Sequence, residues 1–437
     1  GNQRALEMAE KTLMQMYRGG IFDHIGGGFS RYSTDDYFLV PHFEKMLYDN
    51  ALLLMSYAQA FSITQKEEYQ KAARKTAQYI RREMTDSQGG FYSAQDADSD
   101  GVEGKYYTFS YEELTLLLGR SVGRKFNKYF NITRKGNFEG KSIPNRLEHG
   151  QEKENAHPSW EHEKSHTEPE RLLPKVYIYR RQRNGIFLDD KILTSWNGLM
   201  IGAFARMFRV FGQEYYLNQA KAACRFLESH QEEPEMLFVS YRAGKCQGRG
   251  FLEDYAFYAF GLLELYGASL EINYLERAVK YCKKAVELFG DEKQGGFFLY
   301  GRENEPLITV CKETYDGAIP SGNSVMAYNF VKLWQITGEK EWKKQVERQL
   351  NFLASAAENH PAGYSFFLLT CLRYQNPPRH IVCVLKEEKD LKELRKRYGG
   401  EGDILILRKE KGDYKKINGR TTLYICDDCV CRPPINL

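Results

Sequence analysis

Residues 38–61, FLVPHFEKMLYDNALLLMSYAQAF, decide the fold because a charged start leads directly into an apolar helix. His42, Glu44, Lys45 and Asp49 all lie at this start, and most of the following three turns are apolar. A helix without a polar face is expected to be buried on all sides, where charges are avoided. The ionisable groups therefore indicate that one end of this buried helix reaches water.

The same kind of helix recurs along the chain. Apolar segments follow Asn197, Asp254 and Asn323, and each is followed after a short link by an amphipathic helix, as in residues 67–84. Gly-started hairpins with alternating aromatic residues form a third recurring piece, as in GGFSRYSTDDYFLV and GGFFLYGRENEPLITV. The helix starts are farther apart than the roughly 34 residues of a tetratricopeptide solenoid. Inner helices wrapped by outer helices predict an α/α barrel, whose inner-helix starts would meet at one mouth.

Two segments do not follow this pattern. Residues 148–171 are polar and charged without periodicity, which predicts a solvated insertion in a barrel that spans residues 1–375. From residue 376 to residue 437 the pattern changes to strand, helix, strand, which predicts a small α/β module at the C-terminus.

Charge and composition exclude several classes of protein. The 62 basic and 58 acidic residues give a net charge of +4, too even to predict binding to nucleic acid or to an anionic membrane. No apolar run approaches the roughly 20 residues that span a bilayer, and no signal peptide opens the chain. Most of the nine cysteines occur singly, which is typical of reduced thiols in a cytoplasmic protein. We interpret Cys426, Cys429 and Cys431 as reduced structural thiols, although zinc or redox roles are alternatives.

The ionisable residues at the inner-helix starts are the candidate site. Helix capping is a sufficient explanation for single residues such as Asn323, but not for the whole set. Acid/base chemistry on a sugar needs a proton donor and an acceptor whose pKa values differ. The candidate catalytic residues are His42, Asp49, Asp98, Glu253 and Asp254. The candidate substrate-binding residues are His24, Arg31, Glu44, Lys45, Tyr48, Asp96, Trp196, Asn197, Tyr255, Asp316 and Asn323.

A metal site is not expected. Asp96, Asp98 and Asp100 imitate the start of a calcium-binding EF-hand loop, but the twelfth position, which requires a bidentate Glu, is Tyr107. No organic cofactor is expected either.

Five long motifs resemble the bacterial YyaL-like proteins, the family of spermatogenesis-associated protein 20. They are GGIFDHIGGGFSRYSTDDYFLVPHFEKMLYDNALL, SAQDADSDGVEGKYYTF, DDKILTSWNGLMI, GFLEDYAF and DGAIPSGNSV. The resemblance implies an (α/α)6 toroid of the six-hairpin glycosidase type, related to N-acylglucosamine 2-epimerases. It also implies a preceding thioredoxin-like domain, so we expect this chain to be part of a longer protein.

These observations lead to two hypotheses about function. The first is a carbohydrate-processing enzyme, epimerase-like or glycosidase-like, that acts by acid/base chemistry on a small sugar or glycan. The second is a non-catalytic toroid that binds a carbohydrate or protein and acts with a thioredoxin-like domain. The sequence leaves open which of the two is correct.

Overall fold

The computed structural model describes residues 2–147, 168–304, 309–399, 402–427 and 430–437. These residues form two compact units. Unit 1 comprises Gly1–Thr85 and Tyr92–Asp190, and unit 2 comprises Asp86–Phe91 and Lys191–Leu437. No helix among the described residues is both long enough and apolar enough to cross a membrane.

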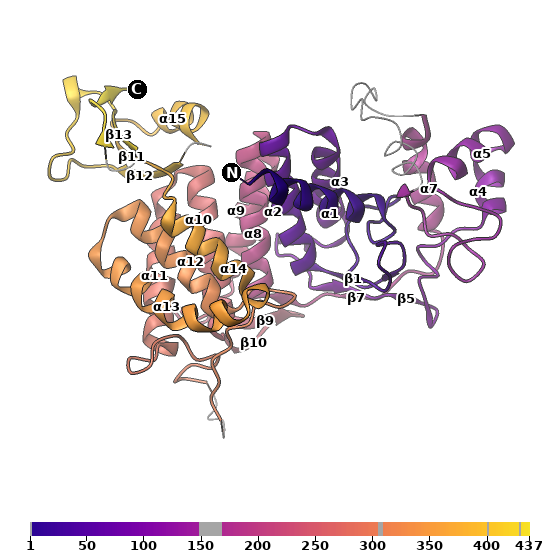
Figure 1. Cartoon of the computed structure of the whole chain (residues 1–437), viewed down its shortest axis with the longest axis horizontal. Helices are drawn as coiled ribbons and strands as arrows, with labels where there is room; N and C mark the ends of the chain where they lie inside the picture. The colour runs from indigo at the N-terminus through magenta and orange to yellow at the C-terminus, as the bar shows by residue number, and fades with distance from the viewer. Residues whose placement is uncertain (1, 148–167, 305–308, 400–401, 428–429) are drawn as a thin grey trace. The chain divides into compact units, whose positions relative to one another are not determined.

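Unit 1 contains an inner and an outer helix flanked by shorter helices. The amphipathic α3 (Glu67–Glu83) packs beside the inner helix α2 (Leu47–Thr64) (Figure 1). Ala and Tyr side chains make up most of the buried face of α3. The remaining helices are α1 (Gln3–Arg18), α4 (Tyr111–Leu118), α5 (Arg120–Tyr129), η1 (Glu168–Leu172) and α7 (Leu173–Arg180). Most of the predicted polar insertion lies outside the described residues, and its last part forms η1.

Short strands join these helices. They pair as β1 (Tyr32–Ser33) with β2 (Pro41–His42), as β5 (Asp98–Ser99) with β6 (Val102–Glu103), and as β3 (Lys45–Met46), β4 (Ala94–Gln95) and β7 (Leu188–Asp189) in one three-stranded sheet. Each strand is only two residues long, so the strands connect segments near the helix starts and do not form a core layer.

Unit 2 repeats the inner and outer pairing. The inner helices are α8 (Thr194–Phe211), α10 (Leu252–Ser269), α12 (Gly322–Thr337) and α14 (Ser365–Gln375), and each packs against the next in this order. The outer helices are α9 (Glu214–Ser229), α11 (Ile272–Phe289) and α13 (Lys340–Asn359). Strand β8 (Ile192–Leu193) pairs with the hairpin of β9 (Phe238–Arg242) and β10 (Lys245–Arg249). The predicted fold class, a mainly helical α/α-toroid type with short hairpins, is confirmed, although the described helices close no barrel within either unit.

Two glycines permit the closest approach of α8 and α10. A Cβ at Gly198 would lie 2.4 Å from the carbonyl carbon of Phe257, and one at Gly261 would lie 2.4 Å from the Gly198 oxygen. Real Cβ atoms do not come so close to backbone, so any side chain here would push the two helices apart.

The C-terminal residues form the predicted α/β module, which belongs to unit 2. Strands β11 (Arg379–Val384) and β12 (Gly402–Leu407) run parallel and are connected through α15 (Asp390–Tyr398). Strand β13 (Thr422–Asp427) lies antiparallel to β11 and also pairs with β14 (Val430–Cys431) and β15 (Ile435–Asn436). The buried Tyr266 hydroxyl of α10 donates to Ile404 O and accepts from Ile406 N, which anchors the module on the inner helices.

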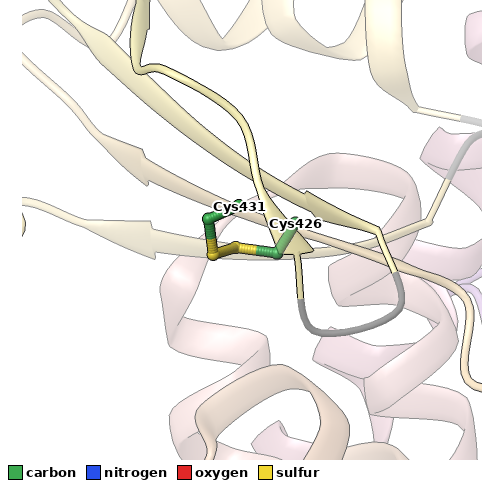
Figure 2. Close-up of a disulfide and its surroundings, with 2 residues drawn as sticks. All are labelled: Cys426 and Cys431. Carbon is green, nitrogen blue, oxygen red and sulfur yellow. A yellow bond between two sulfur atoms is a disulfide. The ribbon is translucent and has the colours of Figure 1, made fainter.

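The prediction of reduced thiols at Cys426 and Cys431 is wrong. The two residues face each other across the antiparallel pair of β13 and β14 and form a disulfide (Figure 2). This pairing brings their Cα atoms to 4.0 Å, so the strand register itself places the two sulfurs within bonding distance. Cys429 lies outside the described residues.

An asparagine near each of three inner-helix starts clasps a Gly-Gly-Phe turn. The Asn50 Oδ1 accepts from Phe29 N (2.8 Å) and its Nδ2 donates to Phe29 O (3.0 Å). Asn197 holds Phe91 in the same way at 2.8 and 2.9 Å, and Asn323 holds Phe297 at 2.8 and 3.0 Å. Each amide therefore satisfies a buried backbone N–H and C=O that no strand partner pairs. We call this arrangement the asparagine clasp.

Removal of one clasp should destabilise the chain strongly. Asn197→Ala leaves buried backbone groups of Phe91 unpaired, at a cost on the order of 1–3 kcal/mol for each group. We expect a loss of about 3 kcal/mol in unfolding free energy, measured by urea titration with circular dichroism. The control Asn359→Ala removes an exposed amide and should change stability by less than about 0.5 kcal/mol. Equal effects of the two changes would contradict the clasp.

Candidate functional site

The first group of predicted site residues gathers at the start of α2 in unit 1. The β1–β2 register places Tyr32 opposite His42, and their rings stack at 5.1 Å with an interplanar angle of 25°. The half-exposed Tyr32 ring presents an aromatic surface to solvent. We name this group the His42 cluster, and its members are Arg31, Tyr32, His42, Glu44, Tyr48, Asp49 and Glu103.

Two carboxylates flank the imidazole of His42. Its Nδ1 lies 2.7 Å from Glu103 Oε1, and its Nε2 lies 3.8 Å from Glu44 Oε2. Glu44 Oε2 also accepts from Arg31 Nη1 at 3.3 Å. The His42 side chain is 30% exposed, so the ring is fixed by its partners and is still open to a ligand.

Asp49 is the unusual acid of this cluster. Its Oδ2 is buried and has no hydrogen-bond partner in the described structure. Burial raises the pKa of Asp49 to about 8, with nearby Glu44 adding to the rise and Arg31 opposing it. The hydroxyl of the neighbouring Tyr48 also hydrogen-bonds with Arg31. Asp49 therefore carries a proton near neutral pH while Glu44 is paired with a cation.

Glu103 belongs to the site, but the sequence did not predict it. The predicted acids of this segment, Asp96 and Asp98, are both exposed, and Asp96 Oδ1 accepts from Ala97 N at 2.7 Å. Glu103 pairs with Asp98 across the β5–β6 hairpin and reaches His42 instead. The available signal was its position, directly across the turn from the predicted acid.

A second group, the acid pair Glu253 and Asp254, lies at the start of α10 in unit 2. Asp254 is buried, and its two oxygens accept from Ser195 N (3.0 Å) and Phe251 N (2.9 Å). Burial raises the pKa of Asp254 to about 7 against these hydrogen bonds, and the adjacent Glu253 adds to the rise. Burial, assisted by Glu313, raises the pKa of Glu253 to about 7. Asp254 therefore caps α10 and ties it to α8, while Glu253 is half-buried.

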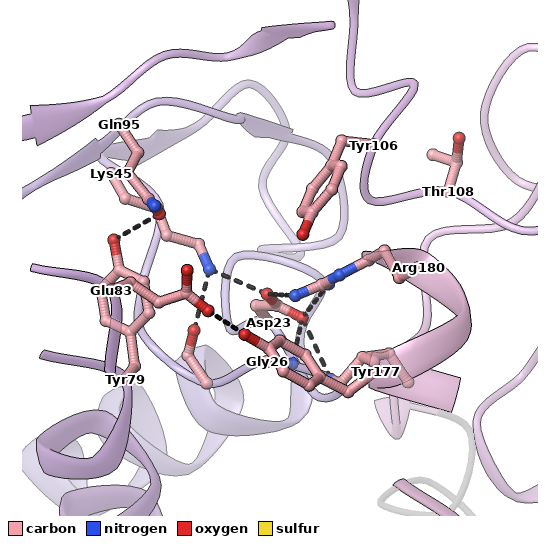
Figure 3. Close-up of polar contacts among 12 residues, drawn as sticks. Asp23, Gly26, Lys45, Tyr79, Glu83, Gln95, Tyr106, Thr108, Tyr177 and Arg180 are labelled. Carbon is pink, nitrogen blue, oxygen red and sulfur yellow. Dashed lines mark hydrogen bonds and ion pairs between the residues drawn. The ribbon is translucent and has the colours of Figure 1, made fainter. Parts of the chain in front are cut away.

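Two predicted substrate-binding residues are buried away from the His42 cluster's open face. Lys45 Nζ donates to Asp23 Oδ2 and to Gly27 O, each at 2.8 Å (Figure 3). Burial lowers the pKa of Lys45 to about 8 although Asp23 opposes the change. His24 Nε2 lies 3.1 Å from Gly19 O, and burial lowers the pKa of His24 to about 3. Both residues have structural partners in the core.

Arg180 completes a buried ion cluster that sequence reasoning missed. Its guanidinium makes two parallel 2.9 Å hydrogen bonds to Asp23, on the other side of the carboxylate from Lys45 (Figure 3). Burial alone would raise the pKa of Asp23, but Arg180 and Lys45 outweigh it and hold the pKa well below its usual range. This interaction attaches α7 to the turn before β1.

The remaining predicted residues in unit 2 mostly bond to backbone. Asn197 and Asn323 are clasp residues, and Asp316 accepts from Ser321 N at 2.9 Å and Phe366 N at 2.8 Å. The Tyr255 hydroxyl accepts from Leu237 N at 3.1 Å. Trp196 is half-buried in the first turn of α8. The starts of α8, α10 and α12 are adjacent, because Asp254 bonds Ser195 and Gly322 packs against Leu252.

Neither group contains a metal-binding constellation. No cluster of three or more His, Cys, Asp or Glu residues suited to a metal occurs in the described part of the chain. The Asp100 carboxylate is bonded by Lys105 and Asn184. A surface pocket of about 280 Å³ beside α4 and α5 is lined by residues that include Tyr111, Leu116 and Arg134. None of its lining residues belongs to the His42 cluster.

Comparison with known proteins places this chain among relatives of known name. Mouse spermatogenesis-associated protein 20 is 34% identical over 99% of this chain, and the human protein of that name is 33% identical over 99%. An uncharacterized protein of Caenorhabditis elegans is 30% identical over 79% of the chain. The chain spans 61% of the mouse protein's length and 51% of the nematode protein's length. No protein-family model matches the chain.

Several solved structures are similar at low identity. A D-mannose isomerase matches with TM-score 0.40 and 17% identity, covering 81% of this chain and 87% of its own. A family 76 mannosidase from Bacteroides thetaiotaomicron matches with TM-score 0.44 and 12% identity, covering 80% and 71%. A sugar epimerase from a ruminal bacterium matches with TM-score 0.38 and 11% identity, covering 80% and 86%. At these scores, no functional statement about this chain rests on the likeness.

The pKa of Asp49 predicts a pH-dependent stability difference. In the unfolded chain Asp49 loses its proton near its ordinary pKa of 3.8, whereas in the folded chain it keeps the proton until about pH 8. The folded state therefore loses stability as the pH rises from about 4 to about 8. Asp49→Asn cannot ionise, so its melting temperature should exceed that of the unaltered chain at pH 8.5 and match it at pH 4. A gap of the same size at both pH values would contradict the raised pKa.

Proposed function

The chain belongs to the family of spermatogenesis-associated protein 20, and from this premise we propose that it processes carbohydrate by acid/base chemistry at the His42 cluster. The proposed reaction is epimerase-like: a proton is taken from a sugar carbon next to a carbonyl and another is delivered. The observation that carries the proposal is that a fixed imidazole and a carboxyl group with a buried, unbonded oxygen lie in the same cluster.

Each group has a role in this proposal. Glu103 accepts the Nδ1 proton of His42 and so fixes the ring, which leaves Nε2 to accept a proton from substrate. Asp49, protonated near neutral pH, donates a proton to the sugar. The proton goes either to the oxyanion that develops at the carbonyl or to the deprotonated carbon, on the face opposite to His42. In this proposal Asp49 is the proton donor and the His42 ring is the proton acceptor.

Substrate binding is assigned to the exposed polar and aromatic members of the cluster. The Tyr32 ring offers the flat apolar surface on which sugars pack, and Arg31 and Glu44 offer hydrogen bonds to hydroxyl groups. The Tyr48 side chain is buried and supports the site by its hydrogen bond with Arg31. Glu44 is already bonded to Arg31, which argues against its use as a glycosidase nucleophile. An epimerase-like reaction therefore fits this group better than glycoside hydrolysis.

The acid pair is assigned a secondary role. Glu253 is half-buried with a pKa of about 7, so it is a second proton donor if a ligand reaches unit 2. Asp254 acts as a positioning residue, because both of its oxygens already accept backbone N–H groups. The exposed Asp96 and Asp98 stay in the proposal only as peripheral contacts in unit 1, and Trp196 only as a peripheral contact in unit 2.

A binding module is the second candidate function. It is favoured by the number of predicted site residues whose side chains are already bonded within the protein, such as Asp316 and Lys45. In that case the chain would bind a glycan or protein and act with a thioredoxin-like domain, in the cytoplasm. The two candidates differ in one respect that can be measured, which is proton exchange on a sugar.

The test follows hydrogen exchange into reducing sugars. The chain is incubated in D₂O with a panel of aldoses, ketoses and N-acetylated hexosamines, and proton NMR detects deuterium at the carbon next to the carbonyl. Glycosides of 4-nitrophenol test hydrolysis in parallel. Exchange supports the epimerase-like proposal, hydrolysis without exchange replaces it with a glycosidase, and neither leaves the binding module as the function.

The variants should identify the acid and the base. For the sugar that exchanges, His42→Gln and Asp49→Asn should each lower the rate by about 10²–10⁴-fold, the usual contribution of one proton-transfer group. The rate should also fall above about pH 8, where Asp49 loses its proton. His360→Gln, at an exposed imidazole outside both groups, serves as the control and should leave the rate unchanged. Full activity in the Asp49 variant with retained folding would remove Asp49 from the mechanism.

A further inference from the structure

A cluster of cationic side chains lies well along the inner helices of unit 2, away from the acid pair at their starts. Two arginines come from α8, a lysine from α12 and an arginine from α14. We name them the cationic cluster, and its members are Arg206, Arg209, Lys332 and Arg373. The carboxylates that face these cations are Glu264 of α10 and Asp403 of β12.

Glu264 contacts three of the four cations. Lys332 Nζ lies 2.6 Å from its Oε1, and Arg206 Nε and Arg209 Nη1 lie 3.0 and 3.9 Å from its Oε2. Burial alone would raise the pKa of Glu264, but Arg206 and Lys332 outweigh it and hold the pKa well below its usual range. The single negative charge of Glu264 therefore faces three positive charges.

Arg373 joins this group through Tyr328. Its guanidinium lies over the Tyr328 ring at 5.7 Å, and the Tyr328 hydroxyl lies 3.5 Å from Arg206 Nη2. Arg373 pairs with Asp403, while its Nε is buried and has no hydrogen-bond partner in the described structure. The rings of Phe260, Tyr328 and Phe366 pack together beneath the two guanidinium groups.

The cluster has an excess of positive charge. The four cations of the cluster and the two carboxylates that face them carry a net charge of +2. Lys332 and Glu264 are buried, whereas the Arg206, Arg209 and Arg373 side chains are 25%, 26% and 20% exposed, so solvent reaches the arginines. Uncompensated charge that is partly withdrawn from water is costly, and a bound anion would relieve that cost.

We propose that the cationic cluster is a binding site for the phosphate group of a small molecule. Three guanidinium groups supply planar, multiply donating edges that match the oxygens of a phosphate better than ammonium groups do. A phosphate dianion carries the charge that balances an excess of +2. The aromatic rings beside the arginines give the rest of the ligand an apolar surface. The proposal concerns unit 2 alone and does not depend on the His42 cluster.

The test is calorimetric titration of the whole chain with three phosphate sources at constant ionic strength set by sodium chloride. Inorganic phosphate, a hexose 6-phosphate and a nucleoside monophosphate are compared. The proposal expects saturable binding of at least one, with a rise in melting temperature that chloride alone does not give. Tightest binding of inorganic phosphate would identify free phosphate as the ligand, and at least tenfold tighter binding of an ester would identify a phosphorylated metabolite.

The variants locate the binding. Arg209→Gln removes a partly exposed cation without unpairing Asp403 and should weaken binding at least tenfold. Arg206→Lys keeps the charge but loses the planar edge and should also weaken binding. Arg134→Gln, at an exposed Arg–Glu pair of unit 1, is the matched control and should bind normally. Circular dichroism confirms that each variant is folded. No binding beyond chloride, or equal binding in Arg209→Gln and Arg134→Gln, would overturn the proposal.

Discussion

The asparagine clasp is the interaction on which the remaining structure depends. A helix start and an irregular Gly-Gly-Phe turn each leave backbone groups without regular partners, and both are buried here. One amide has the donors and the acceptor to serve the turn and its own helix together, as Asn50 does for Phe29 and Met46. Because Asn50 follows Asp49, and because Phe29 precedes Arg31 and Tyr32, the first clasp also brings the members of the His42 cluster together.

A second repeated device reinforces the same turns. Lys45 Nζ bonds Asp23 Oδ2 and Gly27 O, and Lys312 Nζ bonds Asp291 Oδ2 and Gly295 O, each at 2.7–2.8 Å. A lysine that joins a turn aspartate to a glycine carbonyl thus occurs in both units. In unit 1 the Lys45–Asp23 pair is buried, and Arg180 is a further partner of Asp23. Because buried charges need partners, one buried ion brings others with it, and charges accumulate where the apolar helix begins. The charges at the helix start divide into buried structural ions and an open cluster.

The sequence predicted those features whose signals are local. Helix periodicity gave the inner and outer helices, and the run of polar residues before α2 indicated a candidate site. The partners of these residues could not be read from it, because Asp23 and Arg180 are separated by 157 positions and Asn197 and Phe91 by 106. Asn197, Asn323 and Lys45 were therefore assigned to substrate when their side chains bond to the protein. Glu103 was missed because a two-residue strand gives no periodicity.

The chain path of residues 86–91 has a consequence for biosynthesis. These residues precede much of unit 1 in sequence but pack in unit 2, where Asn197 holds Phe91 and the backbone of Gly89 approaches Ala222. A ribosome must therefore release a long further stretch before this early segment finds its partners. Such distant pairings slow folding. Neither unit is a continuous piece of chain, so expression of residues 191–437 alone would omit residues 86–91, which pack in unit 2. The two units are therefore expected to complete their folding together.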